Sequence, residues 1–385
     1  MNLPVKLRHV MVLTGEPSGD FHGARLIHQI RSIDPNIYFS GIGGPDLKSE
    51  NVDLFYNIDQ LSAMGLVEVL MQFSKIKEAF GVFRQKLKTH TPDLLILIDY
   101  PGFNLKAAKF AKEHYNLKIL YYITPKVWAW KKSRIWQIKK YADHCALILP
   151  FEEKIFKKAR IPSTYVGNPL VDEYPEHMSK LFGRSQNIST SKKTVVIGLL
   201  PGSRKAEINN ILPVMLETAQ ILHQKVFDIK FIISQSASID QSHMDPFLEK
   251  LPEPHIFKIQ KGPVKNIFNQ ADLVIAASGT VTLEAALCCV PTILVYKVSP
   301  ATYKIARFFV RLKYVGLANL IVNKEIMPEF LQNDATPQNI SAKAVQMLDN
   351  LNHFQTLLHS VRIFLGEKGA SMKTAKIAVN LLQNR

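Results

Sequence analysis

Short apolar runs alternate with helix-like patterns through the first half of the chain. The runs are almost wholly apolar and lack the strict alternation of a strand that faces water on one side. Between them, apolar positions recur at helical spacing, as in residues 24–31. Continuous apolar strands with helices between them indicate a parallel sheet covered on both faces. The predicted strands of this half are residues 10–13, 38–42, 94–98, 119–122 and 146–149.

The same pattern restarts after the polar stretch 183–193, which is typical of a linker. Residues 207–226 are predicted as a helix, and the tail from residue 337 is helical throughout. We therefore predict an N-terminal Rossmann-like unit over residues 1–185, a second over 186–360, and a last helix within 361–385 that could pack back on the first unit. The predicted strands of the second unit are residues 195–200, 230–233, 273–277 and 292–296.

The balance of charge favours an acidic partner. Lys and Arg exceed Asp and Glu by 16 in 385 residues, and residues 104–143 carry ten basic side chains against two acidic ones. Nucleic acid, an anionic membrane or a phosphorylated substrate would suit this excess, whereas a solvated surface accounts for any single lysine. An RNA-binding protein is one alternative, but the aromatic residues show no RNP-like pattern.

Two further features narrow the class of protein. Cys145, Cys288 and Cys289 form no CxxC pair, which suits reduced thiols in a core rather than a disulfide framework or a metal clamp. Residues 273–296 are apolar enough to raise the question of a membrane span. Polar turns and a proline divide them into strand, turn, helix and strand, so we do not predict a transmembrane helix. The apolar stretch 10–13 is too short for a signal peptide.

Ligands in open α/β sheets bind beyond the carboxyl ends of the strands. That rule selects the loops at residues 15–20, 41–45, 99–104, 201–207 and 278–280.

The loop at residues 201–207 is suited to an anion. Gly202 and Ser203 let the backbone approach a ligand closely at the start of a helix, where amides are unpaired. Arg204 adds a planar fork that matches phosphate oxygens. Glu207, three residues further on, would either pair with Arg204 or bond backward to a backbone amide.

A second loop of the same kind begins the next predicted helix after residues 273–277. Ser278, Gly279 and Thr280 offer hydroxyls and amides for further phosphate oxygens. Glu284 follows one helical turn later, in an otherwise apolar helix, and a ribose hydroxyl pair would supply the donors it needs. The alternatives are a buried ion pair or a helix cap. Neither a P-loop nor a GxGxxG fingerprint is present, and no DxD pair lies at either loop, so we expect no metal and no cofactor.

These loops, read as LLPGSRKAEI and AASGTVTLE, resemble the nucleotide-binding motifs of the lipid-A-disaccharide synthase family. The similarity continues over most of the chain, through TGEPSGDFHGARL, GIGGPDL, MGLVEVL, PDLLILIDYPGFNLKAAK, YYITPKVWAWKKSRI, LPFE, YVGNPLVD and ANLIVNKEIMPEFLQ. Asn168 and Ala318 depart from the family pattern, which more often has histidine and proline there. The resemblance implies the GT-B glycosyltransferase fold, with two facing Rossmann-like domains.

The resemblance also implies an inverting transfer between two acylated glucosamines. UDP-2,3-diacylglucosamine would be the donor, and 2,3-diacylglucosamine 1-phosphate (lipid X) the acceptor, giving a β-1,6 disaccharide 1-phosphate and UDP. A UDP-GlcNAc 2-epimerase or another UDP-GlcNAc transferase with the same architecture is the nearest alternative, and a catalytically inactive relative is another.

A single displacement needs a base for the attacking hydroxyl and stabilisation of the departing diphosphate. Arg204 suits the second task. Relatives carry a further aspartate where this chain has Gly102, so the base falls first to Asp99 and then to Glu16 and Asp20. The matched motifs further imply substrate contacts from Gly15, Ser18, Gly19 and Asn319.

Acylated substrates bring the protein to a bilayer, so we expect a cytoplasmic protein peripheral on the inner face of the inner membrane and no nucleic-acid partner. Tryptophan suits the headgroup region and lysine is attracted to anionic lipid. Core packing or pocket lining is the alternative for both candidate stretches, 127–141 and 301–314. Their candidate residues are Trp128, Trp130, Lys131, Lys132, Arg134, Arg307, Phe308 and Arg311.

Overall fold

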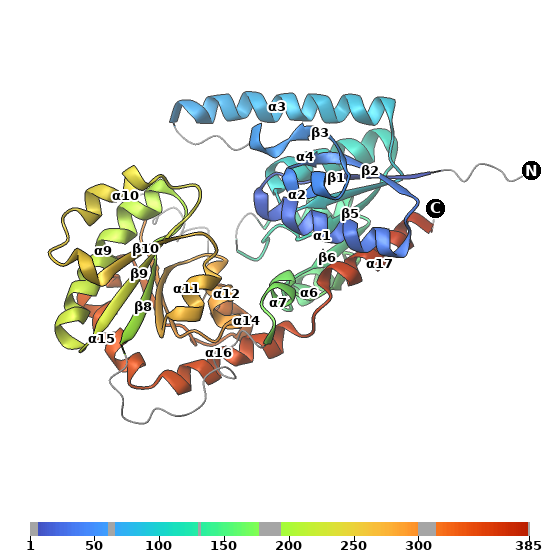
Figure 1. The fold of residues 1–385 in the computed structure, drawn as a ribbon. Helices are drawn as coiled ribbons and strands as arrows, with labels where there is room; N and C mark the ends of the chain where they lie inside the picture. The colour runs from blue at the N-terminus through green and yellow to red at the C-terminus, as the bar shows by residue number, and fades with distance from the viewer. Residues whose placement is uncertain (1–6, 61–65, 130–131, 177–193, 299–312, 384–385) are drawn as a thin grey trace, which may run out of the picture. The chain divides into compact units, whose positions relative to one another are not determined.

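The computed structural model describes residues 7–60, 66–129, 132–176, 194–298 and 313–383. The chain divides into two compact units (Figure 1), one formed by Met1–Pro169 with Glu367–Arg385 and the other by Leu170–Gly366. The division thus falls near residue 169 rather than at 185, because Tyr174 is already bonded to the second unit. The predicted linker at residues 183–193 lies outside the described residues.

The first unit is built on a seven-stranded parallel sheet with the order β3-β2-β1-β4-β5-β6-β7. The central strand β4 (Leu94–Ile98) is buried along its whole length. The other strands are β1 (Arg8–Leu13), β2 (Ile37–Gly43), β3 (Asp53–Asn57), β5 (Lys118–Tyr122), β6 (His144–Leu147) and β7 (Ser163–Tyr165).

Helices cover both faces of this sheet, as its apolar strands require. The side chains of Leu94, Ile96 and Ile98 pack on the face covered by α1 (Pro17–Ile33) and α17 (Ala370–Gln383). Those of Leu95 and Leu97 pack on the face covered by α3 (Leu66–Thr89) and α4 (Pro101–Tyr115). The C-terminal helix therefore lies beside the first helix of the chain. The remaining helices are α2 (Pro45–Ser49), α5 (Arg134–Tyr141) and α6 (Glu152–Lys158).

The second unit contains a six-stranded parallel sheet whose order, β10-β9-β8-β11-β12-β13, repeats the arrangement of the first six strands of the other sheet. Its central strands read as continuous apolar runs. The bounds are β8 (Val195–Leu200), β9 (Ile229–Gln235), β10 (Phe257–Lys261), β11 (Leu273–Ala277), β12 (Thr292–Tyr296) and β13 (Glu329–Leu331).

One face of this sheet packs against the long helix α9 (Lys205–Lys225), together with α10 (Gln241–Leu248) and α15 (Pro337–Leu348). A second group of helices packs together through α12 (Val281–Leu287), α14 (Leu317–Val322) and α16 (Leu351–Leu365). The short helix α11 (Lys265–Gln270) also belongs to this unit, as does α7 (Pro169–Glu173) apart from its first residue.

The predicted fold class, two Rossmann-like parallel sheets flanked by helices, is confirmed. One local prediction was wrong: residues 15–20 are not all loop, because α1 begins at Pro17, where proline is favoured in the first helical turn. All three cysteines are free and buried. Among the described residues, no helix is long and apolar enough to cross a membrane.

Candidate functional site

A pocket of about 680 Å³ lies at the carboxyl edge of the second sheet. It collects the loops that follow β8, β9, β10 and β11, so both loops predicted to hold phosphate contribute to its wall. Its size falls in the ordinary range of small-molecule sites. The lining residues are Leu200, Gly202, Ser203, Arg204, Glu207, Ser234, Gln235, Ser236, Ala237, Gly262, Pro263, Val264, Ala277, Ser278, Gly279, Thr280 and Val281.

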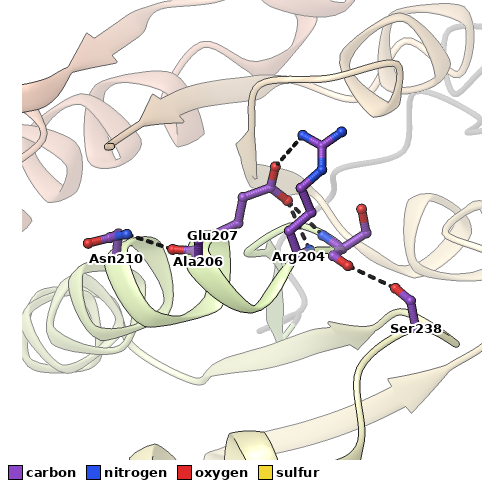
Figure 2. Close-up of polar contacts among 6 residues, drawn as sticks. Arg204, Ala206, Glu207, Asn210 and Ser238 are labelled. Atoms are coloured by element: carbon purple, nitrogen blue, oxygen red, sulfur yellow. Dashed lines mark hydrogen bonds and ion pairs between the residues drawn. The ribbon is translucent and has the colours of Figure 1, made fainter. Parts of the chain in front are cut away.

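Glu207 organises the loop at the start of α9. Its Oε2 accepts hydrogen bonds from the backbone amides of Ser203 (2.8 Å) and Arg204 (3.2 Å), as Figure 2 shows. Gly202 has a φ of +114°, and a Cβ there would lie 2.2 Å from Glu207 Oε2. Glycine is therefore required for the carboxylate to fold back on its own loop. Of the two predicted roles for Glu207, the backward bond to an amide is the principal one.

Arg204 extends from this loop into solvent. Its Nη1 lies 3.3 Å from Glu207 Oε1 (Figure 2), yet the side chain is 77% exposed. An exposed ion pair of this kind contributes little to stability. Most of the guanidinium donors therefore remain open to an anion, on the helix whose N-terminus carries a positive partial charge.

The loop at residues 278–280 lines the same pocket. Gly279 and Thr280 are exposed, and Ser278 is half-buried. One turn along α12, the Oε2 of Glu284 accepts a hydrogen bond from the Tyr174 hydroxyl at 2.5 Å. Burial raises the pKa of Glu284, and the bond from Tyr174 opposes that rise. Tyr174 was not among the predicted site residues, and no motif around it indicated this contact.

Asn319 does not line the pocket, so its predicted substrate contact needs correction. The residue is 0% exposed, and its amide is consumed within the protein. Its Nδ2 donates to the Met327 carbonyl and to Glu329 Oε1, both at 2.7 Å, and its Oδ1 accepts two backbone amides. Asn319 therefore positions the segment that leads into β13.

Asp99 lies at the carboxyl end of β4 in the first unit, in a strained turn. Asp99 and Tyr100 have φ values of 47° and 43°, a left-handed conformation that non-glycine residues rarely adopt. The carbonyl of Asp99 accepts hydrogen bonds from Tyr121 (2.9 Å) and Asn104 (2.8 Å), which hold the turn. Strain fixed in this way is frequent at functional sites.

The Asp99 carboxyl, the first of the predicted bases, is largely buried and has a raised pKa. Burial raises its pKa first, and the negative charge of Glu16 raises it further, while Lys126 and the Tyr100 amide oppose the rise. Glu16 is exposed on the neighbouring loop. Gly15 beside it is buried, and a Cβ there would fall 2.1 Å from the Tyr100 ring. Because Gly15 has no side chain, the ring of Tyr100, the residue after Asp99, can pack against it.

Asp20 was predicted as a base, and the structure contradicts this. Its side chain is 0% exposed, and the carboxylate accepts backbone amides from Gly44 (2.6 Å), Asp46 (2.9 Å) and Leu47 (3.4 Å). A carboxylate satisfied by three amides holds the start of α2 and has no access to a substrate hydroxyl. Nearby, Ser18 is exposed and Gly19 is buried in the first turns of α1.

Gly102, where the resemblance implied an aspartate, is exposed in the first turn of α4. A Cβ built there would meet no atom within 4 Å. The structure therefore has room for a side chain at this position, and steric packing does not explain why this chain has glycine there.

Glu152 is a buried carboxyl that the sequence analysis did not single out, although it ends the LPFE motif. Its oxygens accept hydrogen bonds from Trp128 Nε1 (3.0 Å) and from the Leu149 amide (3.2 Å). Burial raises its pKa to about 7, against the opposing effect of those bonds and of Lys126. Trp128 is therefore tied to the first unit's interior, which favours the predicted alternatives of core packing or pocket lining over membrane contact.

The basic stretch around α5 keeps an exposed aromatic side chain. Ile138 and Tyr141 are buried and anchor the helix, whereas Trp136 is 67% exposed. Lys132 is also exposed and Arg134 is half-buried. The other predicted membrane residues, Trp130, Lys131, Arg307, Phe308 and Arg311, lie outside the described residues.

Within the described ranges, no group of three or more His, Cys, Asp and Glu side chains could hold a metal ion. The expectation that the reaction needs neither metal nor cofactor stays a prediction.

Comparisons with known proteins agree with this geometry. Residues 10–380 match the model of the family described as lipid-A-disaccharide synthetase. A lipid-A-disaccharide synthase from Coxiella burnetii is 37% identical over 97% of this chain and 99% of its own length.

Solved structures share the fold at low sequence identity. UDP-GlcNAc 2-epimerase from Neisseria meningitidis, bound to UDP-GlcNAc, superposes with a TM-score of 0.65 at 12% identity, covering 98% of this chain and 100% of its own. The glycotransferase of kitacinnamycin gives a TM-score of 0.64 at 14% identity, covering 98% and 99%.

Proposed function

The chain belongs to the lipid-A-disaccharide synthetase family, and from this premise we propose the reaction and the residues that carry it. The protein is a glycosyltransferase of lipid A disaccharide formation. Its donor is UDP-2,3-diacylglucosamine and its acceptor is lipid X. The acceptor 6-hydroxyl attacks the anomeric carbon, the bond from that carbon to the diphosphate breaks, and UDP leaves with inversion.

The second unit binds the nucleotide. The observation that carries this assignment is the pocket whose wall joins Arg204 and the start of α9 to the loop at residues 278–280. Backbone amides, hydroxyls and one open guanidinium are the groups that stabilise a diphosphate as it accumulates charge. Glu284 receives the ribose hydroxyls, because its carboxylate retains acceptor positions beyond the one used by Tyr174.

The first unit supplies the base. Asp99 takes the proton from the 6-hydroxyl as the new bond forms. Its raised pKa brings it closer to the value at which a carboxylate is an effective base near neutral pH. Glu16 adjusts that pKa through its charge, and the strained turn keeps the carboxylate fixed.

The test is direct incubation of the protein with UDP-2,3-diacylglucosamine and lipid X, with mass detection of the disaccharide 1-phosphate. We expect product with the acylated donor and none with UDP-GlcNAc. Turnover should persist in excess EDTA, because helix N-termini and Arg204 replace a cation. Conversion of UDP-GlcNAc to its 2-epimer, or strict dependence on magnesium, would contradict the proposal.

We also propose that α5 contacts an anionic membrane surface. Trp136 is exposed among Lys132, Lys139 and Lys140, and the Lys139 ammonium lies 5.9 Å from its ring centroid. Trp136→Ala should weaken sedimentation with anionic vesicles, and added salt should weaken binding of the unmodified protein. Phe227→Ala, which removes an exposed aromatic from the second unit, is the matched control. Equal binding of both variants would argue against α5.

A further inference from the structure

Glu284 and Tyr174 form a short hydrogen bond within the second unit. The two residues are 110 positions apart in sequence, and the donor–acceptor distance is 2.5 Å. Tyr174 is almost fully buried, and Glu284 is half-buried. A hydroxyl that donates to a carboxylate at this distance forms a charge-assisted bond, which is stronger than a bond between neutral groups.

Glu284 is not itself among the residues that line the pocket, and it lies one helical turn beyond the loop that does. It follows Thr280 by four residues, and side chains at that spacing lie on the same side of a helix. Thr280 lines the pocket. Side chains of a helix also lean toward its N-terminus, which is the pocket end of α12.

Tyr174 is itself held in place by a third segment. Arg362, near the end of α16, donates through Nη2 to the carbonyl of Tyr174 and, at 3.2 Å, to the carbonyl of Leu287. One guanidinium therefore joins the segment after α7 to the last residue of α12. Arg362 therefore holds the backbone of Tyr174 and the end of α12, which carries Glu284, in place relative to each other.

We propose that Tyr174 is a positioning residue for the nucleotide: it fixes the carboxylate of Glu284 so that its remaining oxygen positions accept the two ribose hydroxyls. This inference rests on the proposed nucleotide site. A carboxylate offers about four acceptor positions, and Tyr174 uses one of them. A vicinal diol needs two, so tyrosine and ribose bind the same group together without competing.

The protonation state of Glu284 gives the proposal a second consequence. Burial raises the pKa of Glu284, and the Tyr174 bond lowers it. Among the described residues, the other charged or titratable groups that face this pair are Glu173, Cys288 and Arg362. Without the tyrosine hydroxyl, Glu284 should take up a proton at a higher pH and lose acceptor positions for ribose. Nucleotide affinity should then be lost earlier as the pH falls.

The test is calorimetric titration of Tyr174→Phe with UDP and with 2′-deoxy-UDP between pH 5.5 and 8. We expect UDP binding to weaken about ten-fold, and the preference for UDP over the deoxy nucleotide to narrow, because one charged hydrogen bond is lost. As the pH falls, the UDP affinity of the variant should decrease at a higher pH than that of the unmodified protein. Titration of the nucleotide phosphate is common to both proteins and cancels in the comparison.

Tyr38→Phe is the matched control, since Tyr38 donates to Asp53 at 2.6 Å in the first unit. It should leave UDP binding unchanged. In steady-state assays, Tyr174→Phe should raise KM for the donor far more than it lowers kcat. Glu284→Gln should weaken UDP binding and remove the effect of Tyr174→Phe on the pH dependence of that binding. The double variant should therefore bind UDP about as weakly as Glu284→Gln alone.

Two outcomes for Tyr174→Phe would overturn the inference. Unchanged affinity and an unchanged preference for ribose in Tyr174→Phe would show that the hydroxyl does not position Glu284, and tighter UDP binding would show that it competes with ribose. If the unmodified protein binds no UDP at all, the proposed nucleotide site fails and this inference with it. Binding by the unmodified protein therefore separates the two failures.

Discussion

The first six strands of one sheet and the six strands of the other have the same order, but the loop after the first strand is held differently in the two units. In each unit an acidic residue lies in the first turn of the following helix. In the first unit, Asp20 is buried and reaches across to the amides that begin α2. In the second, Glu207 turns back to the amides of its own loop. One carboxylate joins two loops, and the other shapes a single loop.

The consequence is visible at the carboxyl edge of each sheet. In the first unit, Asp20 is bonded to the loop before α2, and the candidate functional residue is Asp99, at the end of β4. Where Glu207 folds back, the loop stays open and Arg204 remains exposed beside a pocket of about 680 Å³. In the proposed function, the same topology therefore carries a base in one unit and an anion site in the other, because the loops differ.

The sharpest test of this division is Asp99→Asn. Loss of the base should lower turnover by about 10²–10⁴-fold, while UDP binding stays normal, because the described residues that line the proposed nucleotide pocket all belong to the second unit. Steady-state rates and calorimetry would measure both. Asp93→Asn, at the opposite end of β4, should leave turnover nearly unchanged. Near-normal turnover in Asp99→Asn would remove Asp99 from the role.

On the side of the second unit, Arg204→Ala should lower kcat by about 10²–10³-fold, because the leaving diphosphate loses its guanidinium. Stability should not change, since the side chain is mostly exposed. Lys205→Ala, one residue further and also exposed, serves as the control in the same assay. Equal losses in both variants would indicate a general effect of charge rather than a specific contact.

The two first-turn acids should differ in what they stabilise. Asp20→Ala leaves three amides without their acceptor in a buried turn, and should cost about 2–4 kcal/mol. Glu207→Ala should cost about 1 kcal/mol, because water reaches the exposed amides. It should weaken UDP binding more than stability. Thermal unfolding would measure the difference, and similar losses in the two variants would refute the comparison.

The smallest expected effect concerns pH. The pKa of Asp99 is raised by burial and by Glu16, so kcat/KM should fall, as the pH falls, earlier than for an ordinary aspartate. Glu16→Gln removes a negative charge, lowers that pKa and moves the acid limb to lower pH. Lys126→Gln removes an opposing positive charge and should move it to higher pH. Shifts in the same direction would argue against Asp99 as the titrating base.

The motifs located Asp99, Arg204 and the loop at residues 278–280 because each follows a strand that reads as an apolar run. They did not disclose Tyr174 or Glu152. Both residues are hydrogen-bonded to partners elsewhere in the chain, Tyr174 to Glu284 and Glu152 to Trp128. Asp20 was predicted as a base and Asn319 as a substrate contact, because an exposed acid or amide and a fully bonded one look alike in sequence.

The sequence by itself determined the central strands of both sheets: β4, β8, β11 and β12 begin and end at the predicted residues. These strands are covered on both faces, so nearly every position must be apolar and the signal is local. The four strands it missed, β3, β7, β10 and β13, are the edges of the two sheets, and none has a continuous buried run.

An edge strand is defined by the neighbour with which it pairs, and an interior hydrogen bond is defined by the fold that buries it. Only the tertiary structure could therefore decide the sheet edges, the closure of Asp20 on α2, and the bond from Tyr174 to Glu284.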